Sequence, residues 1–255
     1  MTWNAEHYLA FADQRTRPAI DLLARVPLRD AERIADLGCG TGNATRVLVE
    51  RWPRATVIGI DSSSDMLANA RRSGIEARWV EADIATWAPD RAFDLIYSNA
   101  ALHWVGDHEA LLPRLLGGLR TGGVLAVQMP RNFEAPSHAL LRATAKSGPW
   151  ADRLARVSDS RPVAAPEWYY DLLAPQALVL DIWETVYLHV LDGDDPVLRW
   201  TRSTALRPIM QALDPADRAA FEAAYAARLR EAYPRRADGR TLFPFRRLFL
   251  VAQRP

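Results

Sequence analysis

The chain has 255 residues, enough for one large α/β domain or for one domain with a lid. Its 32 Lys and Arg residues nearly balance its 31 Asp and Glu residues, so no overall charge favours nucleic acid or a membrane surface as a partner. No apolar run approaches the ~20 residues of a membrane span, and the first residues lack the pattern of a signal peptide. The single cysteine excludes an internal disulfide, so we expect a cytoplasmic protein.

An amphipathic helical leader is predicted over residues 1–30, with apolar residues at helical spacing from Trp3 to Arg25. Pro18 divides this leader into two helices, because proline lacks a backbone N–H and its ring clashes with the preceding helical turn. One interpretation is a helix packed on the edge of a sheet. The other is a lid over a bound ligand, which would use Trp3, Tyr8 and Gln14.

A glycine-rich turn follows the first predicted strand, at Asp36-Leu37-Gly38-Cys39-Gly40-Thr41-Gly42. Such a turn brings the backbone close to a ligand, and the first turn of the following helix offers free N–H groups. The dinucleotide fingerprint needs a third glycine or alanine where this chain has Asn43 or Thr45. No lysine follows, as a phosphate-binding loop would require. NAD and a nucleoside triphosphate are therefore disfavoured, and Cys39 is interpreted as a small turn residue.

Two further acids end predicted strands. Asp61 closes the apolar run 57–61, where a carboxylate can accept both hydroxyls of a ribose. Ser62 and the next two serines offer a helix cap before Met66. Asp83 and Ile84 follow the third strand.

Strands and helices alternate between residues 33 and 129, which predicts a parallel sheet with right-handed crossovers. The segment Leu119–Gly123 is expected to end a helix, with a glycine at its C-terminal cap. The fourth strand leads into Asn99, His103 and Trp104, which would face the cleft at the ends of the strands. The predicted strands are 33–37, 56–60, 77–81, 93–98 and 123–129, and the predicted helices are 43–51, 64–73 and 107–120.

Beyond Pro130 the pattern changes to a helix at 137–148, an irregular connection at 149–166 and a short helix at 169–173. A long strand at 178–190, helices across 195–233 and a last strand at 246–252 follow. Residues 193–240 thus form a helical insertion that would cover the cleft. This cover is dense in arginine and tyrosine, side chains that bind carboxylates and favour a polyanionic small acid.

The glycine turn and the strand-end acids resemble the class I methyltransferases that use S-adenosylmethionine. The resemblance implies an α/β fold: a Rossmann-like, mostly parallel seven-stranded sheet with helices on both faces, the leader, and a helical cap before the last strand. It also implies one domain over 1–255, with the leader at 1–30, a cofactor-binding core at 31–130, and cap helices and closing strands at 131–255. The implied cofactor-binding residues are Asp36, Gly38, Gly40, Asn43, Asp61, Ser62, Met66, Asp83, Ile84, Asn99 and Trp104.

Segments outside these motifs are similar to the trans-aconitate 2-methyltransferase family of bacteria, among them Arg15–Leu23, Tyr169–Asp171, Leu206–Pro208 and Arg247–Phe249. The similarity implies transfer of a methyl group to a carboxylate of trans-aconitate, giving a monomethyl ester and S-adenosylhomocysteine, with no metal, general base or protein partner. Candidate substrate contacts are Arg207, Tyr170, Arg131, His138 and Trp200. Alternatives are a methyltransferase for another small acid, a quinone or a carrier-bound acyl chain, a non-catalytic cofactor-binding protein, and a nucleotide-dependent oxidoreductase.

Overall fold

The chain divides into two compact units, each containing separate segments of the sequence. The computed structural model describes residues 16–155, 157, 163–202 and 204–255. Unit 1 comprises the described residues up to Pro130, together with Ala164–Thr185 and Leu248–Pro255. Unit 2 comprises the described residues of Arg131–Val163 and Val186–Arg247. Residues 164–185 and 248–255 therefore belong to the same compact unit as the chain up to Pro130.

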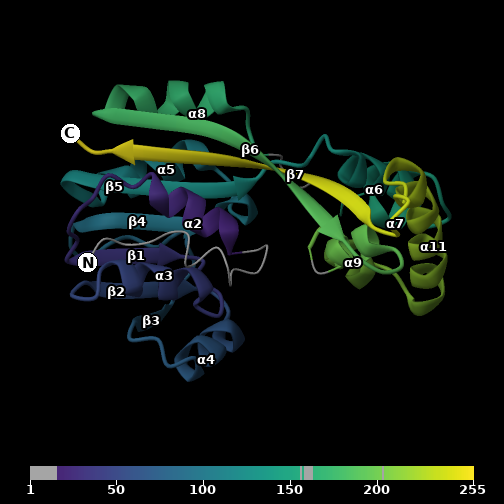
Figure 1. Cartoon of the computed structure of the whole chain (residues 1–255), viewed down its shortest axis with the longest axis horizontal. Helices are drawn as coiled ribbons and strands as arrows, with labels where there is room; N and C mark the ends of the chain where they lie inside the picture. Colours follow the sequence, from purple (N-terminus) through teal and green to yellow (C-terminus); the bar gives the residue numbers. More distant parts are fainter. Residues whose placement is uncertain (1–15, 156, 158–162, 203) are drawn as a thin grey trace. The chain divides into compact units, whose positions relative to one another are not determined.

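Seven strands form one sheet in the order β3-β2-β1-β4-β5-β7-β6 (Figure 1). The pairs β1–β2, β2–β3, β1–β4 and β4–β5 are parallel, which confirms the mostly parallel sheet expected from the sequence. Strand β1 lies near the centre and is almost wholly buried, as its apolar run predicts. The strands are β1 (Arg33–Leu37), β2 (Thr56–Asp61), β3 (Arg78–Glu81), β4 (Phe93–Asn99), β5 (Leu119–Pro130), β6 (Val179–Leu191) and β7 (Thr241–Gln253).

The last strand runs antiparallel to β5. The backbone of Gly122 donates to Arg254 at one end, and that of Arg131 donates to Arg246 at the other. Strand β7 begins at Thr241, five residues earlier than predicted. Strands β6 and β7 both contribute residues to the two units.

The expectation that Leu119–Gly123 ends a helix is wrong. Helix α5 (His108–Gly117) ends earlier and is capped by Gly118. Leu119 instead starts β5 opposite Phe93, and the register then shifts between Phe93 and Leu95. The helix ends at another glycine pair, Gly117-Gly118, five residues upstream of the pair chosen from the sequence, and the irregular pairing with β4 hides the start of the strand.

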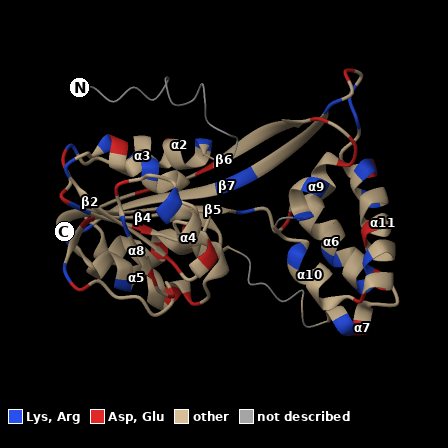
Figure 2. Ribbon diagram, turned by 90° about the horizontal axis from the view of Figure 1, so that it is seen from below, with Lys and Arg blue, Asp and Glu red and all other residues tan. Residues whose placement is uncertain are grey.

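Helices cover both faces of the sheet in unit 1. Figure 2 shows α2 (Arg17–Ala24) and α3 (Asn43–Arg51) on one face, and α5 and α8 (Pro166–Leu173) on the other. The Tyr97 hydroxyl on β4 donates to the carbonyl of Ala19 in α2 at 2.7 Å. The guanidinium of Arg51 donates to the carbonyl of Val26 at 2.9 Å. The described part of the leader therefore packs on the sheet, and its helix α2 has Pro18 in the first turn.

Unit 2 is mainly helical. It contains α6 (Pro136–Lys146), α7 (Ala151–Leu154), α9 (Pro196–Arg202), α10 (Arg207–Ala212) and α11 (Pro215–Ala232). The segment predicted as helical over 195–233 is thus three helices. Phe221, Tyr225 and Leu229 place one face of α11 in a core with Leu141 of α6 and Phe243 of β7, and α6 and α11 lie side by side in Figure 1.

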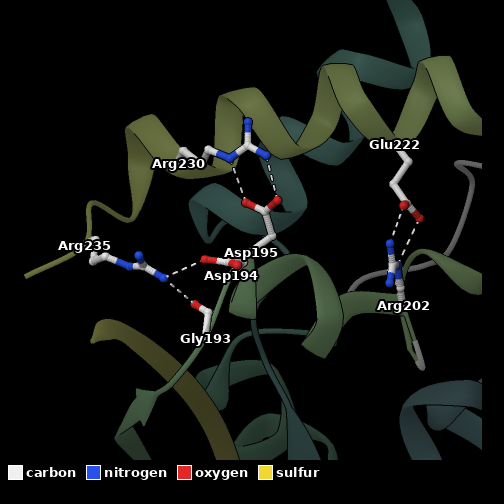
Figure 3. A network of polar contacts seen from close by, with 7 residues as sticks. All are labelled: Gly193, Asp194, Asp195, Arg202, Glu222, Arg230 and Arg235. Atoms are coloured by element: carbon white, nitrogen blue, oxygen red, sulfur yellow. Dashed lines mark hydrogen bonds and ion pairs between the residues drawn. The ribbon is translucent and has the colours of Figure 1, made fainter. Parts of the chain in front are cut away.

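Arginines of α11 and of the segment that follows it bind the loop between β6 and α9 (Figure 3). The guanidinium of Arg230 forms two hydrogen bonds with Asp195, at 2.7 and 2.6 Å. Arg235 donates to the carbonyl of Gly193 and to the carboxylate of Asp194. These contacts hold α9 in place and are separate from the glycine turn, which belongs to unit 1.

Among the described residues, no helix has both the length and the apolar character that crossing a bilayer demands.

Candidate functional site

The glycine turn joins β1 to α3 in the backbone conformation that the sequence predicts. Gly38 and Gly40 have φ angles of 72° and 55°, in the left-handed region that favours glycine. A Cβ atom on Gly38 would lie 2.1 Å from the Cβ of Ala101, so this glycine permits close packing. A Cβ on Gly40 would meet none of the described residues within 4 Å. The protein therefore leaves open space over Gly40, where a ligand can approach the backbone.

Asp61 connects the tip of β2 to the glycine turn. Its Oδ2 atom accepts a hydrogen bond of 2.9 Å from the backbone N–H of Gly40, and its Oδ1 atom accepts one of 2.9 Å from Ser63. Each carboxylate oxygen has two lone pairs, so one acceptor position remains on each for a ribose hydroxyl. The serine that caps α4 (Ser64–Arg72) is Ser63, whose Oγ accepts from the backbone of Met66. Ser62 and Met66 are exposed beside this cap.

Asp36 is the buried acid of the site, with 1% of its surface exposed. Its Oδ2 accepts a hydrogen bond of 2.6 Å from the hydroxyl of Thr45 in α3. Burial raises the pKa of Asp36 to about 7, and the nearby charge of Asp61 adds to this, while the Thr45 hydroxyl acts in the opposite direction. Asp36 thus lies next to the turn as a buried acid that ionises less readily than an exposed carboxyl group.

Cys39 is a free thiol buried inside the turn. Burial, together with the charges of Asp36 and Asp61, raises its pKa far above the usual range. A thiol that stays protonated is a poor nucleophile, which supports its interpretation as a small turn residue.

Asp83 and Ile84 follow β3, as predicted, and Ile84 lies next to the glycine turn. Ile84 is buried, and its Cδ1 atom lies 3.5 Å from where a Cβ on Gly38 would be. Asp83 is exposed, and its Oδ1 accepts from the backbone of Ala85 at 2.9 Å. Together they present an apolar surface and an acid, as the adenine ring and its amino group require.

Asn99 is the last residue of β4, and His103 and Trp104 lie in the segment that follows it. The Oδ1 atom of Asn99 is buried, and no group among the described residues donates to it. Such an unsatisfied acceptor is uncommon in folded proteins and indicates a position for a donor from a ligand. Trp104 is 63% exposed and packs against His103, with ring centroids 4.7 Å apart. Trp104 is therefore available to a ligand and is not part of the core.

His108 holds this loop against α8. Its Nε2 is 2.9 Å from the carbonyl of Leu102, and its Nδ1 is 2.8 Å from the hydroxyl of Tyr169. A carbonyl only accepts, so Nε2 carries the proton, and Nδ1 of the neutral ring accepts from Tyr169. The 3-10 turn Leu102–Trp104 is thus fixed to α8, the helix that also carries the exposed Tyr170.

The other four candidate substrate residues belong to unit 2. Arg131 directly follows β5, and Arg207 is an exposed residue at the start of α10. His138 is half-buried in α6, and burial together with the charge of Arg142 lowers its pKa to about 4, so it is neutral at pH 7. Trp200 stacks on His189 in an aromatic cluster, with ring centroids 4.6 Å apart. The proposed lid residues Trp3, Tyr8 and Gln14 lie outside the described residues.

Comparison with known proteins gives the family. A family model of a methyltransferase domain matches residues 34–123. The trans-aconitate 2-methyltransferase of Azoarcus sp. (strain BH72) is 54% identical over 99% of this chain and 99% of its own. The protein of that name from Rhodopseudomonas palustris (strain BisB5) is 49% identical over 98% of each chain. The chain belongs to the trans-aconitate 2-methyltransferase family. The solved S-adenosylmethionine-dependent methyltransferase of Mesorhizobium loti has 23% identity, covers 96% of this chain and 100% of its own, and shares the fold with a TM-score of 0.54.

The geometry of unit 1 fits the cofactor expected of a trans-aconitate 2-methyltransferase. Among the described residues, nothing fills the space over Gly40 and no group donates to the buried Oδ1 of Asn99, while Asp61 has acceptor positions for ribose hydroxyls. The acidic surroundings, with Asp36 and Asp61, suit a ligand that carries a sulfonium and an amino group. S-adenosylmethionine therefore matches both the shape and the charge of these residues.

Sequence reasoning missed Thr45 and His108 in this methyltransferase. A buried carboxylate such as Asp36 needs a donor, and Thr45 is a hydroxyl residue in the first turn of the helix that follows. That rule could have found Thr45. For His108 the sequence contains no such signal, because its partners Leu102 and Tyr169 come together only through packing of α5 and α8.

Proposed function

We propose that this protein transfers the methyl group of S-adenosylmethionine to a carboxylate of trans-aconitate, giving a monomethyl ester and S-adenosylhomocysteine. The near end-to-end identity of 54% to a protein named for this reaction carries the proposal. The fit of the glycine turn, Asp61 and Asn99 to the cofactor supports it independently of the comparisons.

The reaction requires little chemistry from the protein. S-adenosylmethionine supplies, when bound, a methyl group on a positively charged sulfur. A carboxylate is already an anion at pH 7, so no general base is needed. The protein's contribution is to hold one carboxylate oxygen in line with the methyl group and to exclude water from that oxygen. The raised pKa of Cys39 and the lowered pKa of His138 agree with a site where neither side chain carries a catalytic charge.

Binding of the non-reacting carboxylates is assigned to the candidate residues Arg207, Tyr170, Arg131, His138 and Trp200. Arginine suits this task because its planar guanidinium binds a carboxylate with two parallel hydrogen bonds. The arginines should bind only the carboxylates that do not react, because a tight ion pair would lower the nucleophilicity of the attacking oxygen. We also place the enzyme in the cytoplasm, since its one cysteine is a free thiol.

The decisive experiment is a transfer assay with methyl-labelled S-adenosylmethionine. The purified protein is incubated with trans-aconitate and, in parallel, with a panel of di- and tricarboxylic acids and a quinone. We expect label in an extractable ester of trans-aconitate. Label in another acceptor alone would replace trans-aconitate as substrate, and cofactor binding without label in any acceptor would leave a non-catalytic cofactor-binding protein.

A further inference from the structure

Unit 2 contains a pocket of about 530 Å³ that the sequence analysis did not predict. It lies where the start of α6, the ribbon of β6 and β7, and the segment after α11 meet. The volume is within the range of about 300–1,000 Å³ that small-molecule sites occupy. All residues that line it belong to unit 2.

Positive charge dominates the polar lining of this pocket. Three arginines line it, Arg131, Arg236 and Arg246, against the single acid Glu134. The carboxylate of Glu134 lies 4.0 Å from the guanidinium of Arg142, so its charge is already partly balanced. Among the described residues, no acid pairs with the side chain of Arg236. Arginines thus outnumber acids among the residues that line the pocket, and this favours an anionic ligand.

The backbone fixes two of these arginines next to each other. Asn132 is buried, and its side-chain amide binds both main-chain groups of Arg246, accepting from N–H at 2.8 Å and donating to C=O at 3.0 Å. The N–H of Arg131 donates to the same carbonyl at 2.9 Å. The paired positions therefore do not depend on the arginine side chains and would survive their replacement.

A tight turn positions the third arginine. The N–H of Arg236 donates to the carbonyl of Arg240 at 2.7 Å, and the N–H of Gly239 donates to the carbonyl of Arg236 at 2.9 Å. This turn leads directly into β7, the strand that carries Arg246. The three arginines that line the pocket thus come from separate parts of the chain, and main-chain hydrogen bonds hold the backbone of each.

The floor of the pocket is apolar. Val186 and Leu188 of β6 and Leu242 and Pro244 of β7 line it. An apolar floor with charged groups around it suits a short carbon skeleton that bears several carboxylates, because the skeleton loses contact with water while each carboxylate meets a guanidinium. Inorganic phosphate would use the arginines but not this floor.

We propose that this pocket binds the non-reacting carboxylates of a small tricarboxylate, with Arg246 and Arg236 as anchors beside Arg131. The inference rests on the proposed function, to which it adds two specificity residues that sequence reasoning missed. It also makes Arg131 part of a defined pocket, in place of an isolated candidate.

The test uses the full-length chain with Arg236→Gln, Arg246→Gln and the double variant. Arg240→Gln is the matched control, because Arg240 belongs to the same turn, pairs with Asp192 at 3.3 Å and does not line the pocket. Calorimetry measures the Kd of propane-1,2,3-tricarboxylate and of S-adenosylmethionine, and the transfer assay gives KM and kcat for trans-aconitate. We expect each single change to raise the Kd of the acid and the KM about tenfold, as loss of a charge-assisted hydrogen bond does. The Kd of S-adenosylmethionine should stay within about twofold in every variant.

A double variant that keeps both the KM and the Kd of the tricarboxylate at control values would overturn the proposal. The calorimetric measurement separates this inference from the proposed function. If the unmodified protein methylates no acid but binds propane-1,2,3-tricarboxylate, and the double variant does not, the pocket is supported and the reaction is not. If the unmodified protein methylates trans-aconitate and the double variant does so equally well, the reaction stands and the anchors lie elsewhere.

Discussion

The hydroxyl of Thr45 donates a hydrogen bond of 2.6 Å to the carboxylate of Asp36, and both residues are buried beside the glycine turn. The Thr45 hydroxyl is an uncharged donor. A cation in its place would stabilise the ionised carboxylate more strongly. Burial raises the pKa of Asp36 from 3.8 to about 7. The cofactor-free protein therefore folds with an acid that resists ionisation.

This arrangement predicts a pH dependence of stability for the cofactor-free protein. Because the folded pKa lies above the unfolded one, folded protein holds the proton between about pH 4 and 7, and stability from this group falls as pH rises through that window. The loss is of order 4 kcal/mol, from about 1.4 kcal/mol per pH unit. Asp36→Asn should remove this pH dependence. Relative to the unmodified protein, the variant should therefore have a higher free energy of unfolding at pH 8 than at pH 4. Urea denaturation at both pH values measures this, with Asp65→Asn as the exposed control. Parallel pH curves for the Asp36 variant and the unmodified protein would contradict the assignment.

The open space over Gly40 predicts a separation of stability from cofactor affinity. Gly40 and Gly74 have φ angles of 55° and 71°, and a Cβ on either would meet no atom within 4 Å in the part of the chain that the structure describes. Alanine at either position should therefore cost a similar 1–2 kcal/mol, roughly the penalty of a left-handed residue with a Cβ. Only Gly40→Ala should also weaken binding of S-adenosylmethionine, about tenfold or more, because its methyl group occupies space that the ligand needs. Equal cofactor affinity in the two variants, by calorimetry, would place the ligand away from Gly40.

Adjacent tyrosines on α8 should respond in opposite ways. Tyr169 is fully buried and donates to Nδ1 of His108, whereas Tyr170 is 56% exposed. Tyr169→Phe leaves a buried acceptor without its donor and should lower the free energy of unfolding by about 1–3 kcal/mol. Tyr170→Phe should leave unfolding unchanged and raise the KM for the acid. Urea denaturation and steady-state kinetics on both variants test this, and a stability loss confined to Tyr170→Phe would refute it.

The ion pair between Asp195 and Arg230 should stabilise unit 2 only above acidic pH. The hydrogen bonds from Arg230 hold the pKa of Asp195 below its usual range, so its contribution is present above the unfolded pKa and is lost as pH falls through the folded value. Asn also adopts the φ angle of 45° found here, so Asp195→Asn changes mainly the charge. We expect a loss of about 1 kcal/mol at most at pH 7, since the pair is partly exposed. Thermal unfolding at pH 7 and pH 3 measures it, with the exposed Asp194→Asn as control. A loss that persists unchanged at pH 3 would contradict the electrostatic explanation.

Local patterns sufficed for most of unit 1. Gly38, Gly40 and Asp61 follow strands recognised as apolar runs, and the parallel order of β1 to β5 follows from alternation of strands and helices. These features depend on neighbours in the sequence, so they can be read directly from it. The start of β5 at Leu119 could not be, because an irregular register with β4 decides it.

Contacts between distant segments decide what the sequence did not show. Arg131, Arg236 and Arg246 line one pocket, and Asn132 holds the first and the last of them together by binding the main chain of Arg246, 114 residues away. Likewise, His108 finds Tyr169 through the packing of two helices. In an arginine-rich chain, composition cannot distinguish the arginines that converge from those dispersed over the surface.

The only thiol of the chain lies within the turn that receives the cofactor. Cys39 is buried there and strongly disfavours the thiolate, so a thiol reagent can modify it only when the turn opens. The rate at which Cys39 is modified thus reports how often this turn opens, because the chain has no other cysteine. A ligand that closes over the turn should lower this modification rate. Opening of the cofactor site can therefore be followed without any engineered label.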